Sequence, residues 1–398
     1  MKTRRISRAF TLVELLVVIV IIGILSSLVT VGVMSAVQAA KRAKIATEMN
    51  QITLALESYK NKFGEYPPDL YDKAAVVRHI KKRWPRFQLP ANAPSGINLV
   101  DYQYWALLNA VKNVYQNQSK VDMLKPYDNT ISTSSPFMND QAYPNVRDGV
   151  QYVGALAFWL GGFPNEDGKF AGFSADPEAP FGKEWNRDGS GNTTTVKQIN
   201  NGDDLTWIPD NVLLGTQDKD SVFYEMIIGK NIAYVTTAAG VVFPVLVNVL
   251  RSDHAVPYVY LRGSSSGNKT AYTYSVSGSP TIHSSKFYNF TSTFAGYAWA
   301  ELGLVSAYAK SGDPSTNEPL LVWQEPERFQ LIHPGLDGIF GTGISHPAVD
   351  LNPGSTDQFN ASYFRSTDTN IVTNDIGQKD FDNITNFSDY QQIKSILP

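Results

Sequence analysis

Residues 4–44 read RRISRAFTLVELLVVIVIIGILSSLVTVGVMSAVQAAKRAK and decide how the chain is placed in the cell. A basic leader, residues 1–9, precedes an apolar segment in which the residues from Leu12 to Val37 include one charge, Glu14. The basic residues of the leader are Lys2, Arg4, Arg5 and Arg8. About 20 apolar residues cross a bilayer as a helix, so this segment predicts a transmembrane helix whose leader stays in the cytoplasm.

The leader and the apolar segment differ from a secretory signal peptide in the position of the expected cleavage site. A signal peptide ends its shorter apolar core at a small-residue cleavage site, and the core leaves with the leader. Here the change lies between Ala9 and Phe10, before the apolar segment, so we expect that segment to remain in the mature chain. The alternative is an ordinary signal anchor, but a carboxylate inside a membrane helix is costly and indicates a function for Glu14.

Residues 9–14, AFTLVE, resemble the class III signal of type IV pilins and type II secretion pseudopilins, [GA]-F-T-L-x-E. The resemblance implies cleavage between Ala9 and Phe10 by a prepilin peptidase, N-methylation of Phe10, and assembly by an inner-membrane platform. The product is a filament of one subunit or of several pilin-like subunits. In such a filament we expect Glu14 to pair with the new α-amino group of Phe10 in a neighbour, because an unpartnered buried carboxylate costs several kcal/mol.

Composition limits what the remaining chain can do. The protein has 398 residues and no cysteine, so disulfides and thiolate metal sites are excluded. Loss of the four basic leader residues changes the formal net charge from −3 to −7, which argues against nucleic acid as a partner. The 20 Tyr and 20 Phe favour an exported, β-rich domain with a large core.

The N-terminal helix is predicted to continue well beyond the membrane. After Val37 the sequence becomes amphipathic, with charged residues such as Glu48 and Glu57 on faces other than the apolar one. The apolar positions recur at three- and four-residue spacing: Ile45, Met49, Ile52, Leu56, Tyr59 and Phe63. Gly64 and the pair at 67–68 predict the end of a single helix over 10–63, about 80 Å long, packed on the head.

Residues 64–398 predict a pilin-like α+β head in which the helix lies against an antiparallel sheet. Strand-like runs occur at 232–250, 256–261, 270–278 and 329–335. The loop-rich stretch around 126–220 predicts a large insertion. One or two short helices are expected within 70–125, where basic residues between Arg78 and Arg86 favour a solvated helix face over a contact with lipid or a neighbouring subunit.

The C-terminal region, 329–388, predicts a calcium loop. The segment FQLIHPGLDGIFGTG and the later DFDNITNFS resemble the end of the type II secretion major pseudopilin, and VPYVYL (256–261) is similar to that family's N-P-Y-x-Y strand. The resemblance implies calcium ligation by Asp337 and Asp382, with Asp380 as a competitor for the second position. The alternative is that Asp337 belongs to a simple tight turn.

Motifs of catalysis are missing from the sequence. The five histidines form no H-E-x-x-H, and the chain has no G-x-S-x-G elbow and no phosphate-binding loop. The sequence therefore favours a structural subunit of a type II secretion pseudopilus that drives protein export. It would span the inner membrane once, with its head in the periplasm. The alternatives are a type IV pilus subunit for adhesion or motility at the cell surface and, with little support, an enzyme tethered by a signal anchor.

Overall fold

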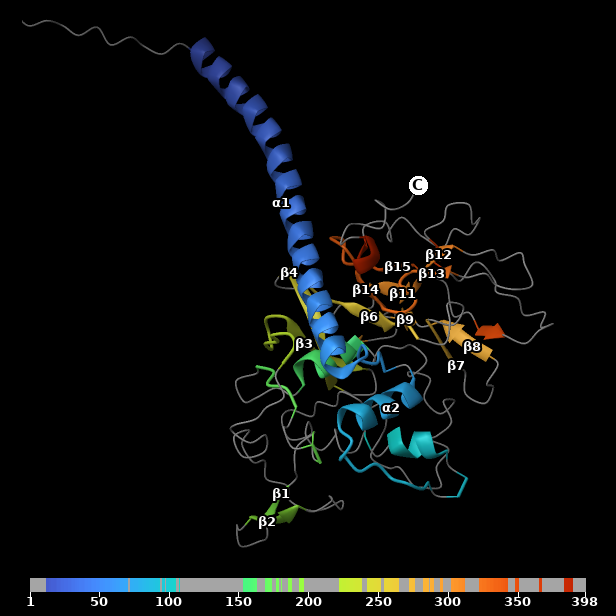
Figure 1. Ribbon diagram of the computed structural model, residues 1–398. Coiled ribbons are helices and arrows are strands. Elements are labelled where there is room, and N and C mark those ends of the chain that lie inside the picture. The colour runs from blue at the N-terminus through green and yellow to red at the C-terminus, as the bar shows by residue number, and fades with distance from the viewer. Residues whose placement is uncertain are drawn as a thin grey trace, which may run out of the picture.

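A long helix, α1, projects from a mixed α+β head in the computed structural model (Figure 1). The structure describes residues 12–70, 72–93, 95–96, 98–104, 107, 153–162, 169–173, 177–178, 180, 185–187, 193–196, 222–237, 242–251, 254–264, 272–275, 282–285, 287–289, 294–295, 302–311, 322–342, 348–350, 365–366 and 383–388. Over these residues the predicted fold class, a long helix with antiparallel sheets, is confirmed.

Helix α1 runs without a break from Leu12 to Phe63, as the sequence predicts for the residues that the structure describes. It contains no proline, and its end follows from local chemistry. Gly64 adopts a left-handed φ of 76°, and its amide donates to the carbonyl oxygen of Lys60. A glycine in this conformation closes a helix because a side chain there would be strained.

The second half of α1 packs on the head through the predicted apolar face. The buried side chains are Ile45, Met49, Ile52, Leu56 and Tyr59. Helix α1 contacts the π-helical turn η5 (Ala157–Gly161), the strands β14 (Phe329–His333) and β18 (Ile384–Thr385), and the 3₁₀ turn η10 (Asn386–Ser388). The core therefore joins α1 to segments that lie far along the chain.

Two antiparallel sheets stand closest to α1. The first has the order β10-β3-β4-β5 and the second the order β18-β14-β6. Their remaining strands are β3 (Ile232–Thr237), β4 (Val242–Arg251), β5 (His254–Pro257), β6 (Val259–Arg262) and β10 (Phe294–Ala295). The strand-like runs at 232–250, 256–261 and 329–335 are thus confirmed as strands.

The other described strands are short. They are β1 (Trp185–Arg187), β2 (Thr193–Val196), β7 (Thr273–Ser275), β8 (Ile282–Ser285), β9 (Phe287–Asn289), β11 (Gly303–Ser306), β12 (Tyr308–Ser311), β13 (Val322–Trp323), β15 (Gly341–Thr342), β16 (Ala348–Asp350) and β17 (Arg365–Ser366). They form the sheets β1-β2, β15-β11-β9, β13-β12-β17 and β16-β8-β7. The pairs β11–β15 and β12–β17 are parallel, and the other strand pairs are antiparallel.

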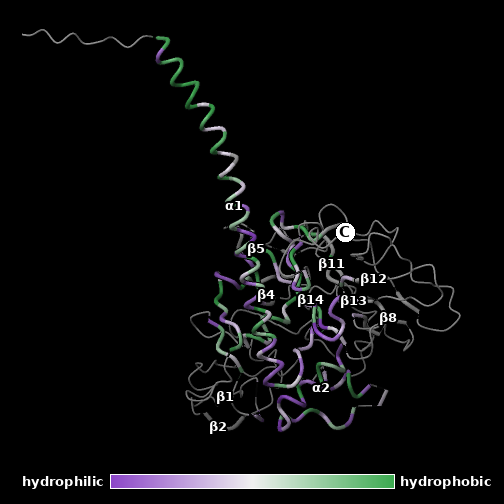
Figure 2. The backbone as a smooth tube through the Cα atoms, turned by 45° about the horizontal axis from the view of Figure 1, so that its top comes forward, coloured by the Kyte–Doolittle hydropathy of each residue, from purple (hydrophilic) through white to green (hydrophobic). Residues whose placement is uncertain are grey.

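Helix α2 (Lys73–Arg83) confirms one of the short helices expected within 70–125. Its N-cap is Asp72, whose carboxylate accepts from the amides of Ala74 and Ala75. Such a cap satisfies helix donors that would otherwise lack a partner. Figures 1 and 2 both place α2 at the opposite end of the molecule from the N-terminal end of α1.

The basic cluster between Arg78 and Arg86, in α2 and just after it, is only partly a solvated face. Exposed members are Arg78, Lys81, Lys82 and Arg86. His79 is buried, and the guanidinium of Arg83 is half-buried over the rings of Phe63 and Trp84, at 4.3 Å from both centroids. Two residues assigned to a charged surface therefore belong to the packing against α1.

Most of the stretch predicted as an insertion, 126–220, lies outside the described residues, but one part of it belongs to the core. In η5 the side chains of Phe158 and Trp159 are buried, and the Trp159 ring packs edge-on to His79 with centroids 5.0 Å apart. Next to it, Gly162 lies so close to Gly172 that a Cβ at Gly162 would be 2.3 Å from the carbonyl carbon of Gly172. The fold depends on a bare backbone at this position.

Gly162→Ala tests that close approach, with Gly229→Ala as the matched control. Both glycines have positive φ, 71° and 78°, but a Cβ at Gly229 would meet nothing within 4 Å. We expect Gly162→Ala to lower the free energy of unfolding by about 1–3 kcal/mol more than the control, because overpacking adds to the backbone strain. Denaturant titration followed by tryptophan fluorescence measures both, and equal losses would contradict the packing argument.

Candidate membrane and assembly surface

The outer half of α1 is apolar on every side and uncovered by the head. Its described large apolar side chains are exposed, from 44% at Val18 to 80% at Leu12, and Figure 2 draws most of this half in green and white. By length and composition, α1 qualifies among the described residues as a helix that could cross a membrane. A helix that is apolar all round is stable when hydrocarbon or other helices surround it. This surface is the candidate site for membrane insertion and assembly.

Glu14 lies in the first turn of α1, with an exposed side chain. A carboxylate at this end of a helix is favoured by the helix dipole. Ala9 and Phe10, the residues of the predicted cleavage site, lie outside the described residues. The cleavage, the methylation and the pairing of Glu14 with a neighbour's amine therefore stay predictions.

Glu48 attaches α1 to the head close to Ile45, where the helix begins to be buried. Its Oε2 accepts from the hydroxyl of Tyr258 at 2.7 Å and from the side-chain amide of Asn248. Burial and the charge of Glu48 raise the pKa of Tyr258 well above its ordinary value, so the hydroxyl stays protonated and donates. Glu48 is predicted off the apolar face of α1, but the structure shows that the head covers this position too.

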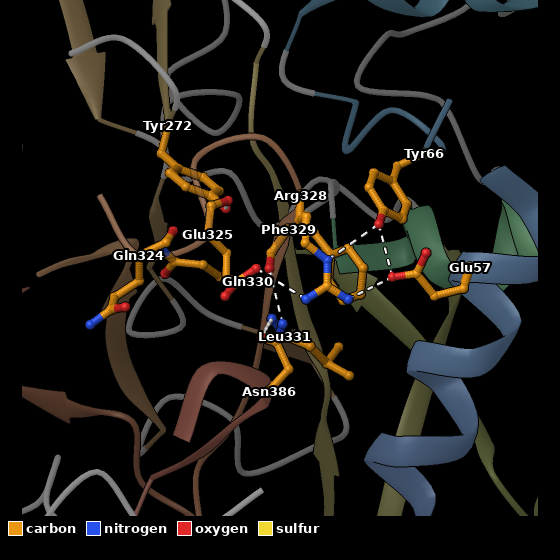
Figure 3. Close-up of polar contacts among 10 residues, drawn as sticks. All are labelled: Glu57, Tyr66, Tyr272, Gln324, Glu325, Arg328, Phe329, Gln330, Leu331 and Asn386. Atoms are coloured by element: carbon orange, nitrogen blue, oxygen red, sulfur yellow. Dashed lines mark hydrogen bonds and ion pairs between the residues drawn. The ribbon is translucent and has the colours of Figure 1, made fainter. Parts of the chain in front are cut away.

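Glu57 makes a second attachment between α1 and the head, closer to the C-terminal end of the helix (Figure 3). Its Oε1 accepts from Arg328 Nη2 at 2.6 Å and from the hydroxyl of Tyr66 at 2.8 Å. Burial opposes ionisation of Glu57, but the hydrogen bonds from Arg328 and Tyr66 outweigh it and lower its pKa. Although Glu57 is predicted off the apolar face of α1, the head reaches it through Arg328 and Tyr66.

The turn over 324–328 holds Arg328 in place. Glu325 has a left-handed φ of 47°, and its carboxylate accepts from Arg328 Nη1 at 3.1 Å. The carbonyl oxygen of Glu325 accepts from the hydroxyl of Tyr272, and Gln330 donates to the carbonyl oxygen of Gln324 at 2.9 Å. A non-glycine residue in this conformation persists when surrounding contacts over-determine it, as they do here. The turn therefore positions the Arg328 guanidinium toward α1.

A third attachment links the end of α1 to α2 and β6. His79 Nδ1 lies 2.8 Å from Glu65 Oε1, and its Nε2 lies 2.6 Å from the hydroxyl of Tyr59. Because Arg83 donates to the Tyr59 oxygen at 2.9 Å, the Tyr59 proton is directed to His79. Arg262 donates to the other oxygen of Glu65 at 2.9 Å. The geometry thus fits a neutral imidazole that donates from Nδ1 to an ionised Glu65.

The surroundings of this third attachment lower the pKa of both His79 and Glu65. Burial lowers the pKa of His79 below 6.5, although the hydrogen bond to Glu65 opposes that change. The hydrogen bond from His79, together with the charge of Arg262, lowers the pKa of Glu65 from 4.5 to about 2. The lowered pKa of Glu65 stabilises the folded state at neutral pH, whereas the lowered pKa of His79 costs stability only when the pH falls below 6.5 and the imidazole has to be protonated.

The two C-terminal segments that resemble a calcium loop lie side by side. Strand β14 pairs with β6 on one side and with β18 on the other, and Asn383 donates to the carbonyl oxygen of Phe340 at 2.9 Å. Asp337 is exposed in the turn that follows β14, and its Oδ1 accepts from the amide of Ile339 at 2.8 Å. That contact is also what a simple turn makes.

The ligand set for calcium is not complete in the part of the chain that the structure describes. Asp380 and Asp382 lie outside it, and the described residues contain no group of three or more His, Asp or Glu side chains that could hold a metal ion. The chain directly after Asp382 nevertheless runs beside the turn of Asp337, because Asn383 contacts Phe340. Calcium binding stays a prediction.

Comparison with known proteins adds one finding, and it falls on the start of α1. Residues 4–30 match the family model described as the prokaryotic N-terminal methylation motif. No curated protein and no solved structure matches the chain. The matched residues contain the predicted cleavage site, Glu14 and most of the exposed apolar half of α1.

The pH dependence of stability tests the attachment at Glu65. Because the folded pKa of Glu65, about 2, is below the value of 4.5, its stabilisation is complete above pH 4.5 and is lost as the pH falls toward 2. Glu65→Gln should lose roughly 3 kcal/mol at neutral pH and lose less than wild type on acidification over that range. His79 contributes a separate loss that begins as the pH falls below 6.5.

Denaturation of the detergent-solubilised chain, followed by tryptophan fluorescence from pH 7 to pH 2.5, measures this slope. Glu327→Gln is the control, since Glu327 is exposed and should keep the wild-type profile. A Glu65→Gln profile parallel to that of wild type between pH 4.5 and 2.5 would contradict the assignment.

Proposed function

We propose that this type IV pilin-like prepilin is a structural subunit of a type II secretion pseudopilus that drives protein export. One observation carries the proposal: the outer half of α1 is apolar on every side and exposed, while the inner half is core. Its N-terminal residues carry the methylation motif. A subunit built in this way is held by a membrane before assembly and by the helices of its neighbours afterwards.

In this proposal the leader is removed by a prepilin peptidase between Ala9 and Phe10, and Phe10 is methylated. The amine of Phe10 then pairs with Glu14 of a neighbouring subunit in the apolar interior of the filament. The pairing rewards the correct axial register, because a misplaced subunit leaves a charge buried without a counterion. An inner-membrane platform supplies the work of assembly, and the chain itself performs no catalysis.

The C-terminal sheet favours secretion over a surface pilus. Three segments resemble the major pseudopilin: β6, β14 with the turn that follows it, and the residues after Asp382. Their strands β6, β14 and β18 form one sheet. We include a calcium ion held by Asp337 and by Asp382 or Asp380 as a structural cofactor of this loop. The size of the head favours the alternative, a type IV pilus subunit that serves adhesion or motility.

Deletion of the gene separates the two functions. For a secretion pseudopilin, the mutant should retain surface filaments and lose specific proteins from the culture medium, which accumulate in the periplasm. Mass spectrometry of both fractions and electron microscopy of the cells measure the outcome. Loss of surface filaments with an unchanged secretome would overturn the secretion assignment and support the pilus.

Complementation with Glu14→Ala tests the assembly role. The variant should insert and lose its leader, yet the filament yield should fall at least roughly tenfold. The reason is that the α-amino group of Phe10 then lies buried without a counterion, which costs several kcal/mol at each subunit contact. Leu15→Ala is the matched control, because it truncates an adjacent apolar side chain and leaves the charge. Immunoblots of sheared or overexpressed filaments measure the yield, and a wild-type yield from Glu14→Ala would refute the pairing.

Asp337→Asn tests the calcium proposal without removing the turn contact. The amide oxygen still accepts from Ile339, so the Tm in chelator should stay near that of wild type. Millimolar calcium should raise the Tm of wild type by several degrees and that of Asp337→Asn much less, and Asp337→Ala should lose the response. Asp72→Asn, at the exposed cap of α2, is the control. An undiminished calcium response in both Asp337 variants would exclude Asp337 as a ligand.

A further inference from the structure

A short cationic segment separates the two halves of α1. We call Lys41, Arg42 and Lys44 the neck. The neck follows the apolar residues directly and ends where the first core side chain of α1, Ile45, is buried. The side chains of Lys41 and Lys44 are exposed, and that of Arg42 is half-buried. All three cations therefore lie within one helical turn, between the apolar surface and the head.

The length of the helix places the neck at a defined depth. Glu14 and Lys41 are separated by about 40 Å at about 1.5 Å per residue. A bilayer measures about 30 Å across its hydrocarbon core and about 40–45 Å with its headgroups. With Glu14 at the inner interface, the neck lies at the phosphate level of the opposite leaflet, just below the head.

The head leaves the charge of the neck largely uncompensated. Lys44 Nζ lies 3.7 Å from Glu48, but Glu48 is already engaged by Tyr258 and Asn248. Among the described residues, no carboxylate lies within ion-pair distance of Lys41 or Arg42. The Nε of Arg42 is buried and makes no hydrogen bond there. The head therefore does not satisfy the Arg42 guanidinium, and the two terminal nitrogens of this half-buried side chain, which are not among the buried unpartnered atoms, are the ones that an external anion can reach.

We propose that the neck binds the phosphate-bearing headgroups of anionic phospholipids in the outer leaflet, and thereby sets the depth of α1 in the membrane. The inference rests on the membrane anchoring in the proposed function. Lys and Arg beside a membrane span snorkel to the headgroups and attract anionic lipids. The basic residues of α2 cannot serve this role, because α2 lies beyond the C-terminal end of α1, well away from its apolar half (Figure 1).

The absence of cysteine permits a direct test of which lipids surround the neck. A donor dye is attached through Ser35→Cys to the full chain, reconstituted in phosphatidylcholine vesicles. The vesicles carry a small fraction of acceptor-labelled phosphatidylglycerol or, in parallel, acceptor-labelled phosphatidylcholine. We expect the phosphatidylglycerol acceptor to be enriched severalfold around the wild-type chain at low salt, and less so at high salt.

Two matched variants decide whether the neck causes the enrichment. K41Q/R42Q/K44Q should abolish it, whereas K81Q/K82Q, which removes exposed cations of α2, should leave it unchanged. Equal transfer to both acceptors in the wild type, enrichment that persists in the neck variant, or loss in both variants would each overturn the proposal. Flotation of the vesicles is checked before any energy transfer is measured. If the chain fails to float with the vesicles, the membrane anchoring is refuted, and the inference about the neck is refuted with it.

Discussion

One continuous helix has to be stable in two surroundings, and this constraint shapes the remainder of the protein. Up to residue 40 the large side chains of α1 are apolar on all sides and, where described, exposed, which suits hydrocarbon or a bundle of identical helices. From Ile45 onward the apolar residues occupy one face and the head covers them. Because no proline or break separates the halves, the orientation of the head follows the orientation of the membrane helix.

The attachments of α1 explain how a small apolar stripe holds a large head. Glu48, Glu57 and Glu65 lie on or just beyond the helix, and each accepts hydrogen bonds from a different part of the head: β4 and Tyr258, the turn of Arg328, and α2 with β6. Carboxylates held by several donors resist both rotation and sliding, since movement in either direction leaves charged groups unpaired. A pull on α1 would therefore be transmitted to the head as a unit.

The parts of the structure that could be predicted from the sequence are those set by local chemistry. The apolar periodicity and Gly64 were sufficient to place the helix and its end, and the strand runs appear as β3, β4, β6 and β14. The partners of Glu48 and Glu57 could not be predicted, because Tyr258 and Arg328 are more than two hundred residues away. The same holds for His79, a member of a basic run that tertiary packing buries beside Trp159.

The central claim is that α1 begins as a prepilin helix whose leader is removed before assembly. The most direct measurement is mass spectrometry of the N-terminal peptide of the protein isolated from membranes, in cells with and without prepilin peptidase. The account predicts a peptide that starts at N-methylated Phe10 when the peptidase is present, and a retained leader when it is absent. A leader that stays intact in the presence of the peptidase would contradict it, and would leave the apolar half of α1 as an ordinary signal anchor.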